Sequence, residues 1–188
     1  MREFQALDLR CHALLHDVPL HDAWVVELDG GGPGRTMRDV HALRERRGPP
    51  ASRAVRTLFA LRFALGRFLG WDGDERNPIA ESYVHRLTDD DRARSLVTPG
   101  TPHGRFRTLY LFPDESLLEV QNATVHAFLA MALRPRADGY TLHWGIYVQP
   151  VGKITRLYMA VIDPFRRWIV YPALIRDMRT AWARTYLE

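Results

Sequence analysis

The chain has 188 residues, of which 46% are hydrophobic, so it is long enough to bury a core and short enough to form one domain. Its 26 basic and 22 acidic residues give a net charge of +4, and the basic residues are scattered along the sequence. Because a phosphate-reading surface needs clustered positive charge, this composition argues against nucleic-acid binding. A single cysteine, Cys11, excludes an internal disulfide framework and a cysteine-rich metal site.

Targeting signals are also missing from the sequence. No apolar run approaches the ~20 residues that a bilayer crossing requires, and the stretch MREFQALDLR lacks the apolar core of a signal peptide. We therefore expect one domain over residues 1–188, a cytoplasmic location and no stable insertion into a membrane.

Three histidines near the start, His12, His16 and His21, stand at intervals of four and five. The first two would share one face of a helix, which is a spacing that could bind zinc. No third ligand follows in a recognised pattern and Pro19 interrupts the segment, so we interpret the histidines as polar surface and expect no metal.

The first expected strand covers residues 22–28, DAWVVEL, and the stretch GGGPGR follows shortly after it. This stretch resembles a phosphate-binding loop but has neither the dinucleotide spacing nor a following Gly-Lys-Ser/Thr, so we interpret it as a connecting loop. Two helices are expected next, at 35–47 and 52–69, and the second has apolar residues at three- and four-residue spacing. The segment 71–78 lacks the oxygen ligands of a calcium loop, so no metal is expected there either.

From residue 104 to residue 162, turns that contain Gly or Pro separate segments rich in β-branched and aromatic residues. This pattern predicts an antiparallel meander with strands at 105–112, 116–121, 124–133, 140–149 and 154–162. A long amphipathic helix is expected to close the chain, with Asp163 as its N-cap and Pro164 at its first position. Trp168 should be buried at its centre, and Pro172 should kink it.

The stretch EVQNATVHAFLA, residues 119–130, places several polar groups inside an apolar segment. With Asn122 and Ala123 as a two-residue hairpin loop, Glu119 stands directly opposite His126, so the carboxylate and the imidazole share one face of the sheet. Such a pair could be a general base with its orienting partner, or a half-buried structural pair. We interpret His143, Tyr147 and Tyr158 as packing or rim residues of later strands.

Sequence resemblance extends this interpretation. The segment ITRLYMAVIDPFRRWIVYPALIRDM resembles the C-terminal signature of an uncharacterised bacterial family, a domain of unknown function, through Arg-Leu-Tyr at 156–158 and Pro-Phe at 164–165. LFALRFALGRFLGWD, residues 58–72, resembles its central helix. That family is similar to the START and birch-pollen-allergen (SRPBCC) superfamily, whose α+β helix-grip fold wraps a curved antiparallel sheet around a long C-terminal helix.

The resemblance implies an apolar cavity between the sheet and the final helix. It also implies that His126 matches a family histidine, whereas Phe128 and Ala130 replace an acidic residue and an arginine. We therefore expect a START-like domain that binds a small hydrophobic molecule or lipid without a cofactor. The residues expected to bind it are Phe128, Trp144, Tyr147, Tyr158, Phe165 and Trp168.

Two alternatives remain open. The first is an enzyme of the polyketide-cyclase or hydratase type, in which His126 acts as the base and Glu119 orients it. The second is peripheral association with a membrane surface, because the last helix combines aromatic residues with arginines at 166, 167, 176, 179 and 184.

Overall fold

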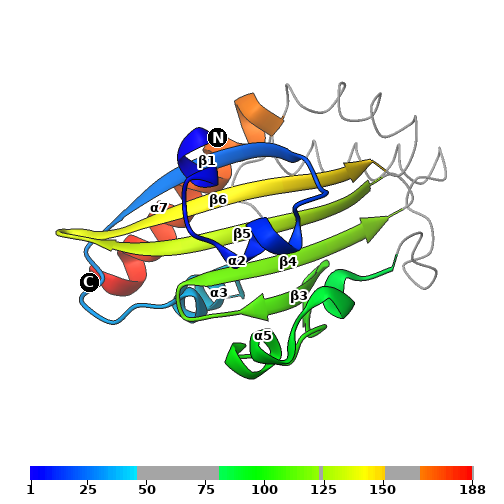
Figure 1. Ribbon diagram of the computed structural model, residues 1–188. Coiled ribbons are helices and arrows are strands. Elements are labelled where there is room, and N and C mark those ends of the chain that lie inside the picture. The colour runs from blue at the N-terminus through cyan, green and yellow to red at the C-terminus, as the bar shows by residue number, and fades with distance from the viewer. Residues whose placement is uncertain (46–80, 123–124, 151–165, 188) are drawn as a thin grey trace.

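The computed structural model describes residues 1–45, 81–122, 125–150 and 166–187. Within these residues the chain is α+β, with a curved six-stranded antiparallel sheet in the order β1-β6-β5-β4-β3-β2 and a C-terminal helix packed on it (Figure 1). The strands are β1 (Leu20–Asp29), β2 (Pro102–His103), β3 (Phe106–Leu111), β4 (Glu115–Asn122), β5 (Val125–Arg136) and β6 (Gly139–Pro150).

The sheet confirms the expected meander and the helix-grip-like class. The first expected strand is β1, and the strands expected at 105–112, 116–121, 124–133 and 140–149 are β3 to β6. The short edge strand β2 was not expected. The strand expected at 154–162 and the helix expected at 52–69 lie outside the described residues, as does the turn at 71–78.

Helices cover both faces of the sheet. They are α1 (Arg2–Gln5), α2 (Arg10–Leu14), α3 (Met37–Glu45), the 3₁₀ turn η1 (Tyr83–Arg86), α5 (Asp89–Arg94), the π-helix η2 (Arg166–Val170) and α7 (Tyr171–Tyr186). One face packs against α3 and α7, and we call it the α7 face. The other packs against α1, α2 and η1, and we call it the N-terminal face (Figure 1).

The alternation along β5 shows why the sheet is buried on both sides. Phe128, Ala130 and Ala132 belong to the core of the N-terminal face, whereas Leu129 and the alternate residues that follow belong to the core of the α7 face. Because both faces are covered, the strand sequence is a nearly continuous apolar run. The Glu119 and His126 side chains are therefore buried polar groups within the apolar part of this strand pair.

The final helix begins later than the sequence predicted. α7 starts at Tyr171, directly after the π-helix η2, and Pro172 lies in its first turn. Pro172 therefore stands at the junction of two helical segments and not in the interior of one α-helix as expected, and the kink stays a prediction. From Tyr171 onward the expected apolar stripe is confirmed, since Tyr171, Met178 and Trp182 are buried. The expected cap at Asp163 and Pro164 lies outside the described residues.

Trp168 is the clearest error among the core predictions. It lies in η2 and is 81% exposed, so it is not a central core residue. The apolar pattern was read at 3.6 residues per turn, whereas a π-helix bonds residue i to residue i+5 and turns its side chains through smaller steps. The stripe of α7 therefore does not continue through η2, and Trp182 occupies the core position that Trp168 was expected to hold.

The hairpin between β4 and β5 has a different register from the predicted one. Asn122 belongs to β4 and pairs with Val125, so Glu119 stands opposite Phe128 and Gln121 stands opposite His126. The loop was placed one residue too early, which changes the cross-strand pairing by two residues. Because the side-chain period of a strand is two, a shift of two keeps every side chain on its expected face. Glu119 and His126 are therefore diagonal neighbours on one face.

The glycine-rich segment after β1 serves close packing. Gly31 has a φ of +94°, and a Cβ atom there would lie 2.6 Å from the ring of Trp182. The hydroxyl of Tyr140 donates to the carbonyl of Gly32 at 2.8 Å. These contacts attach the segment to the C-terminal helix and the sheet, as expected for a connecting loop.

Candidate functional site

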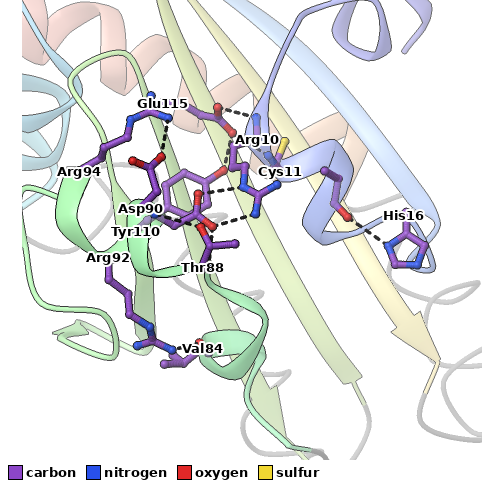
Figure 2. Close-up of polar contacts among 12 residues, drawn as sticks. Arg10, Cys11, His16, Val84, Thr88, Asp90, Arg92, Arg94, Tyr110 and Glu115 are labelled. Atoms are coloured by element: carbon purple, nitrogen blue, oxygen red, sulfur yellow. Dashed lines mark hydrogen bonds and ion pairs between the residues drawn. The ribbon is translucent and has the colours of Figure 1, made fainter.

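A buried carboxylate attaches the N-terminal segment to the sheet. Glu115, on β4, accepts hydrogen bonds from the backbone amides of Arg10 and Cys11, both at 2.9 Å, and from the hydroxyl of Tyr110 (Figure 2). The two amides belong to the first turn of α2, where backbone donors have no partner within the helix. Glu115 thus takes the place of an N-cap side chain for α2. These three hydrogen bonds give Glu115 a structural role.

Arg10 extends the same attachment to α5. Its guanidinium contacts both carboxylate oxygens of Asp91 at 2.8 Å, and Thr88 forms a capping box with Asp91 at the start of the helix. Burial opposes ionisation of Asp91, but the hydrogen bonds from Arg10 and Thr88 outweigh it, so the pKa of Asp91 is lowered. The N-terminal helices and α5 are therefore joined by a charged pair.

Glu119 and His126 form a second buried polar pair on the N-terminal face. The Nε2 atom of His126 lies 2.7 Å from Oε1 of Glu119, and the two residues are 1% and 3% exposed. The expected contact on one sheet face is confirmed, although it arises from the diagonal register. Both residues are more buried than the half-buried pair that the sequence suggested.

The carboxylate of Glu119 has several donors besides the imidazole. Ser82 donates its hydroxyl to Oε2 at 2.6 Å, and the backbone amide of Tyr83 donates to Oε1 at 3.0 Å. Burial by itself would raise the pKa of Glu119, but the hydrogen bonds from His126, Ser82 and Tyr83 outweigh burial and lower it. The group is therefore a carboxylate at neutral pH, and it holds η1 against the sheet.

The contact with Glu119 fixes the tautomer of His126. An ionised carboxylate only accepts hydrogen bonds, so the proton of the neutral imidazole lies on Nε2. Nδ1 then carries a lone pair, and it is buried without a hydrogen-bond partner in the described part of the chain. The geometry is that of an imidazole oriented by a carboxylate and able to accept a hydrogen bond or a proton.

Aromatic rings surround this imidazole. The ring of Tyr83 meets it edge-on with centroids 5.1 Å apart, and the ring of Phe128 lies 4.5 Å away. Arg86 in turn stacks over the outer side of Tyr83 at 3.6 Å. The imidazole of His126 thus lies between aromatic rings, the carboxylate of Glu119 and the side-chain amide of Gln121, whose nitrogen is 3.1 Å from Nε2.

A pair of tryptophans lies on the α7 face. Trp24 on β1 and Trp144 on β6 are directly paired across the strands. Their rings lie 5.2 Å and 6.4 Å from the ring of Tyr171, the first residue of α7. Both indole nitrogens are buried, and neither has a partner among residues 1–45, 81–122, 125–150 and 166–187. An indole N–H is a donor only, so the site presents two unused donors.

The residues expected to bind a ligand do not gather in one place. Phe128 and Tyr147 lie on the N-terminal face, and the hydroxyl of Tyr147 contacts Nδ1 of His12 at 2.8 Å. Trp144 lies on the α7 face, and Trp168 is exposed. Tyr158 and Phe165 lie outside the described residues. His143 is buried on the N-terminal face, and burial lowers its pKa.

Sequence reasoning missed Trp24, Gln121 and Gln149 as site residues. Trp24 was read as one apolar residue of a strand, and only the pairing of β1 with β6 reveals Trp144 as its partner. Gln121 and Gln149 become significant because both stand beside His126 in the register. The sequence could have indicated Gln121, because it stands two residues after Glu119 and therefore on the same face of the strand. Nothing in the sequence indicated that Gln149 of β6 is paired with His126.

The arginines considered for a membrane surface lie mostly on the outside. Arg167, Arg176, Arg179 and Arg184 are exposed, and Arg179 donates to the backbone carbonyl of Glu27 at 3.2 Å. No helix among the described residues is both long enough and apolar enough to cross a bilayer. Association with a membrane surface stays a prediction.

Comparison with known families was made on the whole sequence. Residues 14–173 match the family described as a protein of unknown function, DUF2867. The chain belongs to this family. Its match confirms the expected membership in an uncharacterised domain family and covers both the Trp24–Trp144 pair and the Glu119–His126 pair. No curated protein matches the chain.

Proposed function

We propose that this DUF2867 domain is a binding module for a small apolar molecule that carries a hydrogen-bond acceptor, held between the sheet and α7. The observation that carries the proposal is the Trp24–Trp144 pair, which presents two buried indole donors without partners in the described chain. Buried donors are normally bonded, so two adjacent exceptions favour a ligand group that is absent.

The chemistry of the surroundings defines the ligand class. Rings of Trp24, Trp144 and Tyr171 supply apolar area, and Met131 stands opposite Trp144 on the neighbouring strand. Small-molecule sites combine such apolar walls with a few placed polar groups. An uncharged carbonyl or ether oxygen would accept from the indoles. The resemblance to the START superfamily supports the same location.

The test uses 2-octanone, which pairs an apolar chain with one acceptor oxygen, and octane, which lacks the oxygen. Trp24→Phe and Trp144→Phe replace the indole by a smaller aromatic ring and remove the indole N–H, so the comparison with octane separates lost apolar area from the lost hydrogen bond. Each variant should bind 2-octanone about 3–10-fold more weakly, as expected for one lost hydrogen bond, while its affinity for octane stays within about twofold. Affinities would be measured by isothermal titration calorimetry.

Trp168→Phe is the matched control, because the Trp168 side chain in η2 is exposed. It should bind both molecules as the wild type does. If 2-octanone binds none of the proteins, or binds the two indole variants as tightly as the wild type, the proposal is wrong.

Catalysis by His126 with Glu119 is the second candidate, and the unpaired Nδ1 atom favours it. The pair lies on the N-terminal face, so it could not act on a molecule held against α7 on the other side of the sheet. A catalytic role would therefore need a separate substrate site around His126.

A further inference from the structure

Three polar side chains form a row across β4, β5 and β6 on the N-terminal face. Gln121 is paired with His126, and His126 is paired with Gln149. Each has one buried polar atom without a partner in the described residues, namely Oε1 of Gln121, Nδ1 of His126 and Oε1 of Gln149. Directly opposed residues in a sheet have Cβ atoms about 4.5–5.5 Å apart, so the three belong to one site, which we call the acceptor row.

The energetic argument is that such a row is unfavourable when empty. A buried polar group without a hydrogen bond destabilises the fold, and folded proteins rarely leave such groups unpaired. One isolated case has many explanations. Three neighbouring cases across three strands indicate a site that a bound molecule completes.

All three free atoms are acceptors. In the neutral imidazole, Nδ1 of His126 holds a lone pair, because Nε2 donates to the carboxylate of Glu119. Gln121 turns its amide nitrogen toward the same carboxylate, 3.2 Å from Oε1, and this leaves its carbonyl oxygen free. The molecule that completes the row must therefore supply a hydrogen-bond donor.

The charged and aromatic groups around His126 restrict the class of ligand further. An ammonium group would need an available carboxylate when buried, but the oxygens of Glu119 already accept from Ser82, Tyr83 and His126. The rings of Tyr83 and Phe128 beside the imidazole suit an apolar body. A neutral hydroxyl group on an apolar molecule meets both conditions.

We propose that the acceptor row is a second ligand site, which binds a neutral apolar molecule by accepting its hydroxyl proton in a hydrogen bond at Nδ1 of His126. Tyr83 packs edge-on against the buried imidazole, so its ring must move when the molecule enters. The site lies on the face opposite the Trp24–Trp144 pair and does not depend on the function proposed for that pair.

The experiment compares phenol with toluene, which has a methyl group in place of the hydroxyl, on the full chain. Affinities are measured by calorimetry, and the ring nitrogens are followed by long-range ¹H–¹⁵N NMR on histidine-labelled protein. Phenol should bind at least tenfold more tightly than toluene and shift the Nδ1 resonance of His126. The resonances of His143 should stay in place.

Two variants separate the acceptor row from binding elsewhere. His126→Gln places an amide where Nε2 contacts Glu119 and removes the acceptor at Nδ1, so the preference for phenol should fall below threefold. His143→Gln is the matched control, since His143 is buried on the same face with an unpaired Nδ1 but pairs with Val25 and Ala132. It should keep the full preference.

If His126→Gln fails to fold, Gln149→Leu replaces it and should lower the preference at least threefold. Equal affinity for phenol and toluene in the wild type, or no binding of either, would mean that water alone fills the row and would overturn the proposal. A preference that survives the loss of Nδ1 would overturn it as well, because phenol would then be bound elsewhere.

Discussion

The two faces of the sheet are both buried, yet they are held in different ways. On the α7 face the contacts are mostly apolar, and the buried polar groups include the hydrogen-bonded pair His41–Ser116 and the indoles of Trp24 and Trp144, which have no partner in the described chain. On the N-terminal face, the buried carboxylates of Glu115 and Glu119 attach short helices to the strands. Helices of four or five residues bury little area, so side-chain hydrogen bonds replace the long amphipathic stripe that secures α7.

The largest expected effect tests whether Glu115 holds the N-terminal face together. Glu115→Ala leaves the amides of Arg10 and Cys11 and the hydroxyl of Tyr110 without their acceptor. At roughly 1–3 kcal/mol for each buried donor, the free energy of unfolding should fall by about 4–6 kcal/mol in urea titration. Glu27→Ala, an exposed site on β1, should change it by less than about 0.5 kcal/mol. Equal losses would refute the special role of Glu115.

On the α7 face, the corresponding test concerns packing. Trp182 is 1% exposed and donates its indole N–H to the carbonyl of Asp29 at 3.0 Å. Trp182→Ala should therefore lower the free energy of unfolding by about 3–5 kcal/mol. Trp168→Ala should lower it by less than about 0.5 kcal/mol, because Trp168 is exposed. Chemical denaturation of both variants checks the pair, and the reverse order would restore the sequence-based view of the helix.

Acid pH should weaken the N-terminal face through Glu119. Because its folded pKa lies below the usual value of 4.5, ionised Glu119 contributes stability above that pH, and the contribution is lost as the pH falls through the lowered pKa. Glu119→Gln should cost about 1–3 kcal/mol at pH 7, and the difference from the wild type should shrink below pH 4.5. Urea titrations at several pH values would measure it. A difference that is constant with pH would contradict the ionised state of Glu119.

The smallest expected effect compares the stability lost when an indole N–H without a partner is removed with the stability lost when a hydrogen-bonded indole N–H is removed. Trp24→Phe removes an N–H group that has no partner in the described chain, so the loss of stability comes only from the smaller ring of a half-buried side chain and should be smaller than that of Trp182→Phe. Trp182→Phe removes the bond to Asp29 and should cost about 1 kcal/mol or more. Thermal unfolding of the two variants side by side would show the contrast, and a larger loss in Trp24→Phe would reveal a structural partner for that indole.

Local patterns predicted the elements well and their partners poorly. The alternation of apolar residues in 105–149 predicted four strands correctly. Glu119 and His126 were also predicted correctly to share one face of the sheet, although the hairpin loop was placed one residue too early. The exposed Trp168 was missed because nothing in the sequence signals a π-helix before Pro172. Which face of the sheet each helix covers depends on pairing between β1 and β6, more than one hundred residues apart. Trp144 and Phe128 lie on opposite faces because Phe128 is paired with Tyr147, three residues after Trp144 on β6.

The most direct test of the account is ¹H–¹⁵N NMR of the tryptophan indoles during titration with 2-octanone. Each tryptophan contributes one indole N–H signal, and assignment follows from the Phe variants. The account predicts that the signals of Trp24 and Trp144 move downfield as their protons bond to the ketone oxygen, whereas those of Trp168 and Trp182 stay in place. Octane should produce no downfield shift. If the ketone binds and leaves both signals unmoved, the molecule is not held by the paired indoles and the central claim is contradicted.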